Sequence, residues 1–381
     1  MRWIALSALA SFAAAAGAAP ADEPNPALNE PDRLAWSLFA RLNQRAAVQV
    51  EVGPAKAATN DSVWETWADD AQTFPAAPSR KAPPAWPEAR HKVLLRPRQR
   101  DLRRELQRLR LLAAPGGAGA AQPIPVAGPG DSEEVRRNRP SFDYIVDDGL
   151  YYVQGLRAAF AKGTPLAFPL DAIEVKANWV PIGEGDKARY HWNYDSQGKL
   201  YGMVAMHVMT KLVPNWTWAT FEWVDNPGRC DFLGCHDAFG VLPHDVAPNA
   251  TTDQGYPPGQ LTPELLALLD ANGVAPEFRN YRLKGSQVDF TDATGRHMLL
   301  GNSVTESGFV ASSSCLTCHT QSSADLTGTI RPRAGFDPDN QSYNGAPDPA
   351  WFYDTTTQPW SVNELPLDFV WGFIAAQPAV D

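Results

Sequence analysis

Cysteine is scarce in this sequence, and no long apolar run follows the N-terminal segment. The 381 residues include four cysteines. A membrane-spanning helix needs roughly 20 consecutive apolar residues, so the chain is not expected to cross a membrane once that segment is removed. Basic residues are also in deficit, with 33 against 43 acidic ones, and the formal net charge is -10. This charge argues against nucleic acid as a partner. It favours a partner protein that carries a basic patch.

The N-terminal segment has the features of an export signal. Arg2 provides a short basic start, residues 4–16 are an apolar run, and residues 16–18 are a small-residue cleavage site. This order is typical of a secretory signal peptide and predicts removal of residues 1–18. An uncleaved anchor helix is the alternative, but the run is short for a membrane span. We therefore expect the mature chain, residues 19–381, in the periplasm or outside the cell.

The mature chain is expected to form a single domain with long loops. The sequence contains 34 prolines and 28 glycines, residue types that favour turns. Residues 113–131 are rich in Gly, Ala and Pro without a hydrophobic period, which predicts a flexible surface loop. This loop is the best candidate boundary, but it does not separate two complete patterned halves.

Hydrophobic patterning predicts an α+β fold, in which an antiparallel sheet is surrounded by peripheral helices and long loops. The predicted helices cover 31–47 and 263–272, and the predicted strands cover 172–179, 199–212 and 216–224, with a hairpin pairing 281–290 and 296–300. Alternation makes 172–179 a half-buried strand. The 199–212 strand is apolar on both sides, and we expect it to carry Met203, His207 and Met209 on one face.

Residues 315–319, C-L-T-C-H, match the attachment sequence of c-type haem. Positions i, i+3 and i+4 share one face of a helical turn, so two thiols can meet the haem vinyl groups while the imidazole reaches the iron. The motif predicts one haem c held covalently by Cys315 and Cys318, with His319 as the proximal iron ligand. The alternatives are a disulfide or a thioredoxin-like redox pair formed by these two cysteines. Neither alternative requires His319.

The other two cysteines, Cys230 and Cys235, are followed directly by His236. Some multihaem cytochromes attach haem through a C-x4-C-H spacing, so a second haem is one interpretation. The other is a disulfide that closes a small loop, and we favour it because export favours disulfides and the pair lacks the standard haem spacing.

No Met, His, Lys or Cys follows His319, so a sixth iron ligand of these types must come from upstream. His207 is the first candidate because its predicted strand is buried and also carries two methionines. Met298 and His297, in the predicted hairpin before the motif, are the alternatives. His207 could instead be a core histidine, and an open sixth position would let the iron bind a small molecule.

Further residues could complete a haem pocket. Arg331 and Arg333 follow the motif and are candidates for contacts with the haem propionates, although solvated surface arginines are an equal alternative. Trp216, Trp218 and their aromatic neighbours along the next predicted strand could wall the pocket or form plain core.

Beyond the motif, several segments resemble a family of exported bacterial proteins known mainly as "cytochrome c family" sequences. They are Val63-Trp64-Glu65-Thr66-Trp67, Ala172-Ile173-Glu174-Val175-Lys176-Ala177, Trp218-Ala219-Thr220-Phe221-Glu222 and Asp368-Phe369-Val370-Trp371. The resemblance implies haem binding and electron transfer carried on Cys315, Cys318 and His319. It implies nothing about a substrate.

Two functions follow from these patterns. The first is a periplasmic monohaem electron carrier or redox subunit that meets a redox partner protein, and is not an enzyme. The second is a haem enzyme, of peroxidase or oxygenase type, with an open sixth coordination site. A binding protein without haem is a third class, and it requires the motif to be a coincidence.

Overall fold

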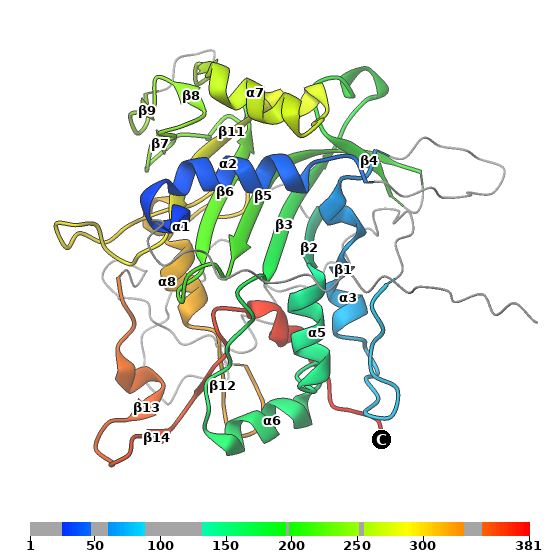
Figure 1. Ribbon diagram of the computed structural model, residues 1–381, viewed down its shortest axis with the longest axis vertical. Helices are drawn as coiled ribbons and strands as arrows, with labels where there is room; N and C mark the ends of the chain where they lie inside the picture. The colour runs from blue at the N-terminus through cyan, green and yellow to red at the C-terminus, as the bar shows by residue number, and fades with distance from the viewer. Residues whose placement is uncertain (1–24, 47–59, 88–131, 196–197, 251–254, 331–344) are drawn as a thin grey trace, which may run out of the picture.

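The computed structural model describes residues 25–46, 60–87, 132–195, 198–250, 255–330 and 345–381, and its main feature is a seven-stranded antiparallel sheet (Figure 1). The strands lie in the order β1-β2-β3-β5-β6-β11, and β4 pairs with β5 beside this path. Their bounds are β1 (Ala68–Asp69), β2 (Ser132–Arg137), β3 (Ile173–Pro181), β4 (Trp192–Tyr194), β5 (Leu200–Thr210), β6 (Thr217–Trp223) and β11 (Tyr281–Gln287). The predicted α+β class with a large antiparallel sheet is confirmed.

The helices lie around this sheet and below it in the view of Figure 1. They are α1 (Pro26–Asn29), α2 (Pro31–Leu42), α3 (Asp70–Thr73), α5 (Arg139–Asp147), α6 (Val153–Lys162), α7 (Pro263–Ala271) and α8 (Cys315–Thr320). Short 3-10 helices cover Val63–Thr66, Glu184–Asp186, Pro276–Asn280, Val310–Ser312, Pro349–Trp351 and Trp371–Ala375. Two-residue strands pair as β7 (Cys235–His236) with β9 (Asp245–Val246), β8 (Val241–Leu242) with β10 (Gln260–Leu261), β12 (Ser323–Ala324) with β15 (Leu365–Pro366), and β13 (Tyr353–Asp354) with β14 (Ser361–Val362).

Helices α2 and α7 begin where local signals predict. Pro31 occupies the first position of α2, where its missing N–H costs nothing. Thr262 caps α7 by accepting a hydrogen bond from the N–H of Leu265 at 3.1 Å, and Gly273 follows the helix with a φ of +63°. Helix α2 ends at Leu42, about a turn earlier than predicted.

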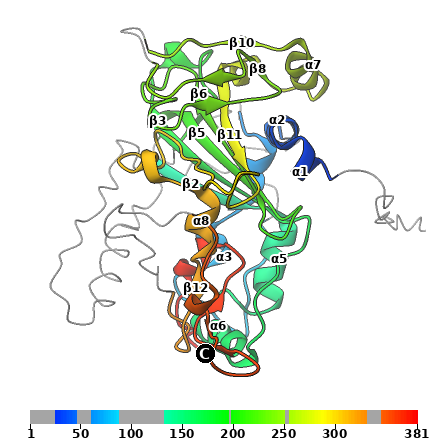
Figure 2. The same cartoon turned by 90° about the vertical axis from the view of Figure 1, so that its left-hand side faces the viewer.

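The sheet is covered on both faces. Helix α2 crosses one face (Figure 1; Figure 2), where Trp36 and Phe39 pack against Phe221 in a first core cluster, the α2 core. The other face carries Met209 and Trp218, which belong to a second core cluster together with residues of α8. Side chains alternate across a strand, so neighbouring residues of β5 and β6 serve the two cores in turn.

Strand β3 corrects the prediction of a half-buried strand. Glu174 and Asn178 are buried, as are Val175 and Ala177 on the other face. The charge of Glu174 is compensated by an ion pair with buried Arg137 at 3.3 Å. The alternating polar residues of β3 therefore face a buried polar layer and not solvent. Other parts of the chain supply their interaction partners.

The prediction that Met203 shares a face with Met209 is wrong, because β5 contains a β-bulge. Asn178 lies opposite Ala205 while the next residue, Trp179, lies opposite Met203, so Val204 is an extra residue in β5. A bulge of this kind changes which side chains point to each face. Met203 consequently packs in the α2 core, whereas Met209 packs in the second cluster.

The predicted hairpin between 281–290 and 296–300 is present only next to its turn, where the N–H of Met298 donates to the carbonyl of Phe290 at 2.9 Å. Strand β11 pairs with β6 along its whole length, and the turn that follows closes with a single bridge between Thr291 and His297. The turn chemistry itself is as expected, since the N–H of Gly295 donates to the carbonyl of Asp292 at 2.9 Å. Tyr281 and Leu283 fill the α2 core, and this burial favours pairing at the edge of the sheet.

Helix α8 lies between the sheet and the lower part of the molecule (Figure 2). The lower part contains α5, α6 and the C-terminal strands, and its apolar side chains, among them Phe168, Leu365 and Phe373, join the second core cluster.

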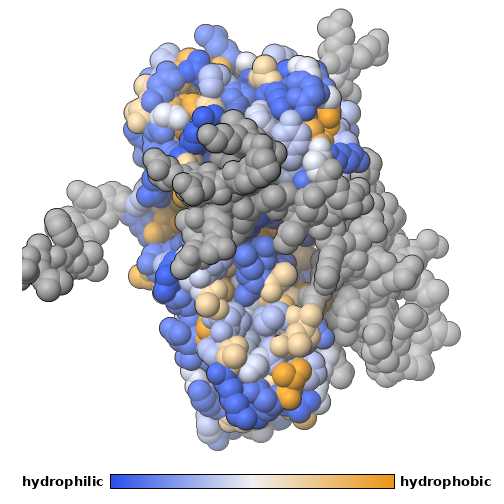
Figure 3. All heavy atoms as spheres, turned by 90° about the vertical axis from the view of Figure 1, so that its right-hand side faces the viewer, coloured by the Kyte–Doolittle hydropathy of each residue, from blue (hydrophilic) through white to orange (hydrophobic). Residues whose placement is uncertain are grey.

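The face in Figure 3 is largely hydrophilic over its described residues, with apolar side chains in small patches. No helix in the described ranges is long and apolar enough to cross a membrane.

Two predicted segments lie outside the described residues. These are the signal peptide, residues 1–18, and the flexible loop at about 113–131. The organisation of residues 19–381 as one domain stays a prediction.

Candidate functional site

The C-x-x-C-H motif forms helix α8, as its spacing predicts. Ser314 caps the helix, and its hydroxyl accepts a hydrogen bond from the N–H of Thr317 at 3.3 Å. Both motif cysteines are free thiols, with Cys315 buried and Cys318 exposed. The alternative of a disulfide between them is therefore not what this structure contains.

Gln287, the last residue of β11, fixes the start of α8 against the sheet. Its side-chain amide donates to the Ser314 hydroxyl at 2.9 Å, and its carbonyl oxygen accepts from the N–H of Leu316 at 3.2 Å. Gln287 is also the register partner of Trp218 on β6. A rigid strand thus determines where the motif lies, which is the arrangement that precise sites require.

The imidazole of His319 is held in one tautomer. Its Nδ1 lies 2.8 Å from the carbonyl oxygen of Phe369, and a carbonyl can only accept, so Nδ1 carries the proton. Nε2 keeps the lone pair that binds metals. Burial lowers the pKa of His319 to about 4, so the ring is neutral near pH 7.

Trp218 packs against His319 from the sheet. The two ring centroids are 4.4 Å apart, and the indole nitrogen donates to the carbonyl of Asn215 at 3.1 Å. Trp216 belongs to the same core cluster, whereas Phe221 and Trp223 lie in the α2 core. The aromatic run is therefore divided between the two faces, and Trp218 is its member at the His319 ring.

His207 lies on the sheet face that α8 covers. Burial lowers the pKa of His207 well below its usual value, and the positive charge of Lys176 lowers it further. Its Nε2 is buried and has no hydrogen-bond partner. Such orphaned nitrogens are rare in proteins, and this one belongs to the residue predicted as the distal iron ligand.

Glu306 is a neighbour of His207 that the sequence did not indicate. Its Oε2 lies 3.7 Å from Nε2 of His207, too far for a hydrogen bond. The same oxygen accepts from the N–H of Asn302 at 2.6 Å. Burial raises the pKa of Glu306 to about 7. The spacing of Asn302 and Glu306 in the sequence is consistent with a local cap. That spacing gives no sign that the carboxyl lies next to His207.

The loop that carries Glu306 is anchored to the sheet by side chains. The Asn302 amide donates to the Thr220 hydroxyl at 2.8 Å, and the Thr305 hydroxyl donates to Asn178 at 2.8 Å. Lys176 on β3 adds a positive charge to the same region and pairs with Glu133 at 3.1 Å. The sheet face towards α8 is therefore polar and charged, and it is only partly covered, since the side chains of Lys176 and Glu133 are 31% and 39% exposed.

The remaining candidates differ in position. Met298 is partly buried, and its backbone carbonyl accepts from Gln287 at 3.1 Å. His297 is exposed and lies beside Gly345. Arg331 and Arg333, predicted to contact haem propionates, lie outside the described residues.

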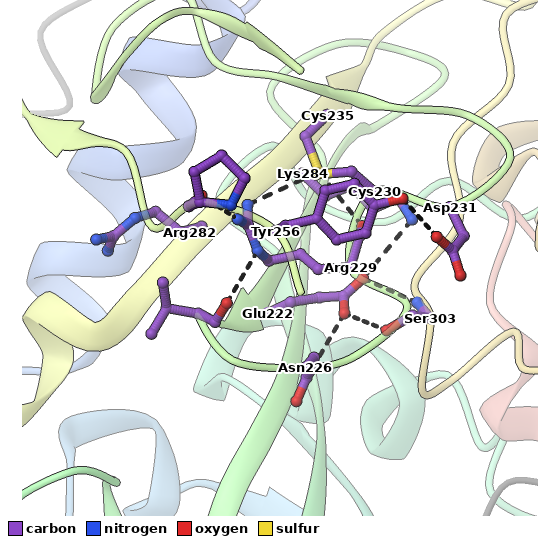
Figure 4. The surroundings of a disulfide bond; sticks show 12 residues. Glu222, Asn226, Arg229, Cys230, Asp231, Cys235, Tyr256, Arg282, Lys284 and Ser303 are labelled. Carbon is purple, nitrogen blue, oxygen red and sulfur yellow. Dashed lines mark hydrogen bonds and ion pairs between the residues drawn. A yellow bond between two sulfur atoms is a disulfide. The ribbon is translucent and has the colours of Figure 1, made fainter. Parts of the chain in front are cut away.

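Cys230 and Cys235 form the predicted disulfide, with Cα atoms 5.1 Å apart (Figure 4). Tyr256 packs on the bridge, and Arg229 beside it donates to the Pro257 carbonyl at 2.9 Å. Exposed His236 lies 2.6 Å from Asp245 through its Nδ1. Because both sulfurs are in the bridge, this structure offers no thiols for a second haem at His236.

Replacing Cys230 and Cys235 together with Ser is expected to lower the free energy of unfolding by about 2 kcal/mol, because a bridge across so short a loop removes little chain entropy. Chemical denaturation measures this loss. The visible spectrum should be unchanged, and loss of haem from the double variant would assign the pair to cofactor attachment instead.

Comparison of the chain with protein-family models, with curated proteins and with solved structures gave no match.

Within the described ranges, no three His, Cys, Asp or Glu side chains converge as they would around a bare metal ion. A haem iron makes a smaller demand, because the porphyrin supplies four ligands and the protein one or two.

The residues around α8 fit a covalently held haem. Two free thiols lie on one helical turn with an imidazole whose Nε2 is available. A second imidazole nitrogen, that of His207, lies buried and unpartnered on the facing sheet. These are the donor types that attach and ligate haem in c-type cytochromes.

Proposed function

We propose that this protein is a periplasmic or secreted monohaem c-type cytochrome that transfers electrons to or from a partner protein. Cys315 and Cys318 would hold the haem covalently, and His319 would bind the iron through Nε2. When bound, the haem supplies a one-electron redox couple. The observation that carries the proposal is the fixed tautomer of His319 on the same helical turn as two free thiols.

The chain's own residues would set the properties of that couple. The Phe369 carbonyl orients His319 and makes its imidazole more basic. Trp218 covers one side of the ring and limits water there. His207 would provide the second protein ligand through its orphaned Nε2. Burial and ligand identity are the means by which proteins tune haem potentials.

Mass spectrometry of the protein, produced in a host with haem-attachment machinery, tests the proposal. We expect one haem addition per mature chain, because one pair of free thiols is present among the described residues. A mass without haem would contradict the proposed function. Two additions would instead require haem at Cys230 and Cys235.

A haem enzyme with an open sixth position is the second candidate, and Glu306 favours it. Its Oε2 and the Nε2 of His207 lie 3.7 Å apart, so a carboxyl and an imidazole share one region next to the motif. Such a pair could hold or transfer a proton beside a bound small molecule. Binding of carbon monoxide by the reduced, unmodified protein would support this candidate, and an unchanged spectrum would support the electron carrier.

A further inference from the structure

We propose that the buried ion pair between Lys211 and Asp368 is a positioning device for His319, which holds the Phe369 carbonyl in place and thereby sets the reduction potential. The inference rests on the proposed function, since it concerns a haem on Cys315 and Cys318. It assigns this role to Lys211 and Asp368, two residues that lie far from the motif in the sequence.

The Phe369 carbonyl reaches His319 only because of an unusual backbone turn. Asp368 and Phe369 both have positive φ values, +49° and +70°. Residues with a side chain rarely adopt this left-handed conformation, and two in succession require support from their surroundings. The turn directs the Phe369 carbonyl to within 2.8 Å of Nδ1 of His319.

The N–H of Val370 closes the turn by donating to the Leu367 carbonyl at 3.1 Å, and the Asp368 carboxylate ties the turn to the rest of the fold. Its Oδ1 lies 2.5 Å from Nζ of Lys211, and its Oδ2 accepts from the N–H of Phe168 at 2.7 Å. Lys211 also donates to the Pro214 carbonyl at 2.7 Å. The side chains of Lys211 and Asp368 are only 9% and 6% exposed. Charge-assisted hydrogen bonds in such a site are strong and directional.

The ion pair joins the two sides of the candidate haem site. Lys211 directly follows β5, the strand that carries His207. Asp368 directly precedes the residue whose carbonyl orients His319. Asp368 is therefore tied to the distal strand, and the proximal imidazole is tied to Asp368 through one peptide unit.

The expected consequence follows from the hydrogen bond at Nδ1. A well-placed carbonyl acceptor makes the imidazole a stronger electron donor, which stabilises oxidised iron. If the turn relaxes, the bond lengthens and the reduced form becomes relatively more stable. The potential should therefore become more positive when the ion pair is removed.

Potentiometric titration of the haem-loaded Lys211→Met and Asp368→Asn variants tests this inference. Both should carry covalent haem and show about a tenfold shift of the redox equilibrium towards the reduced form, equivalent to about 59 mV for one electron. The matched control is Glu174→Gln, which breaks another buried ion pair, with Arg137. It should lower the melting temperature without moving the potential.

Asp368→Gly provides the variant for the case in which the others do not fold. Glycine adopts a positive φ without strain, so this variant keeps the turn accessible while it removes the link between Asp368 and Lys211. Its potential should rise by less than that of Asp368→Asn. Potentials equal to that of the unmodified protein in the folded variants would overturn the inference and leave the pair a purely structural one. Absence of haem from the unmodified protein would instead contradict the proposed function itself.

Discussion

Replacement of Cys315 and Cys318 together with Ser is expected to abolish covalent haem attachment completely. A serine hydroxyl does not form the thioether link that a thiol forms with a haem vinyl group. The two thiols are free and lie one helical turn apart on α8, so each single variant should keep one link. Haem staining after denaturing electrophoresis and the intact mass measure the loss.

The control for this experiment is the Ser variant of the disulfide, Cys230 and Cys235, which removes the same number of sulfur atoms. It should retain haem through denaturation. Haem that survives denaturation in the Cys315 and Cys318 double variant would show that attachment occurs elsewhere in the chain.

Replacement of His207 with Ala should convert a six-coordinate haem iron into one that binds carbon monoxide. His207 presents a buried, unpartnered Nε2 on the sheet face that α8 covers, and its removal leaves the distal side without an imidazole. We expect the reduced variant to bind carbon monoxide stoichiometrically and its low-spin spectrum to change, whereas the unmodified protein shows neither. Difference spectra with and without carbon monoxide measure the effect.

His236→Ala is the matched control, because His236 is an exposed histidine paired with Asp245. Its spectrum should equal that of the unmodified protein. If the His207 variant also behaves like the unmodified protein, His207 is a core histidine, and Met298 or an open position next to Glu306 becomes the better assignment.

Local sequence predicted the parts of the site that depend on few residues. The spacing of Cys315, Cys318 and His319 predicted one helical turn, and α8 is helical over these residues. The short separation of Cys230 and Cys235 favoured a disulfide, which is present. Caps such as Thr262 predicted the start of α7. Each depends on contacts within a few residues, which the sequence expresses directly.

Strand pairing was harder to predict. The apolar pattern of 199–212 indicated a buried strand, but the extra residue at Val204 moved Met203 to the opposite core. The run 281–287 pairs with β6 and not with the segment after its own turn. A turn signal indicates a change of direction, whereas the choice of partner depends on which face of the whole sheet is buried.

The sequence by itself determined the chemistry: two thiols and an imidazole at haem spacing, a disulfide, and a strand that carries His207. Only the tertiary structure decided the surroundings, namely Gln287 at the start of α8, Glu306 beside His207, and Asp368 held by Lys211 beneath the Phe369 carbonyl. The reason is physical. Covalent spacing and helical periodicity act over a few residues, while the partner of a buried polar group is whichever group the folded chain brings to it.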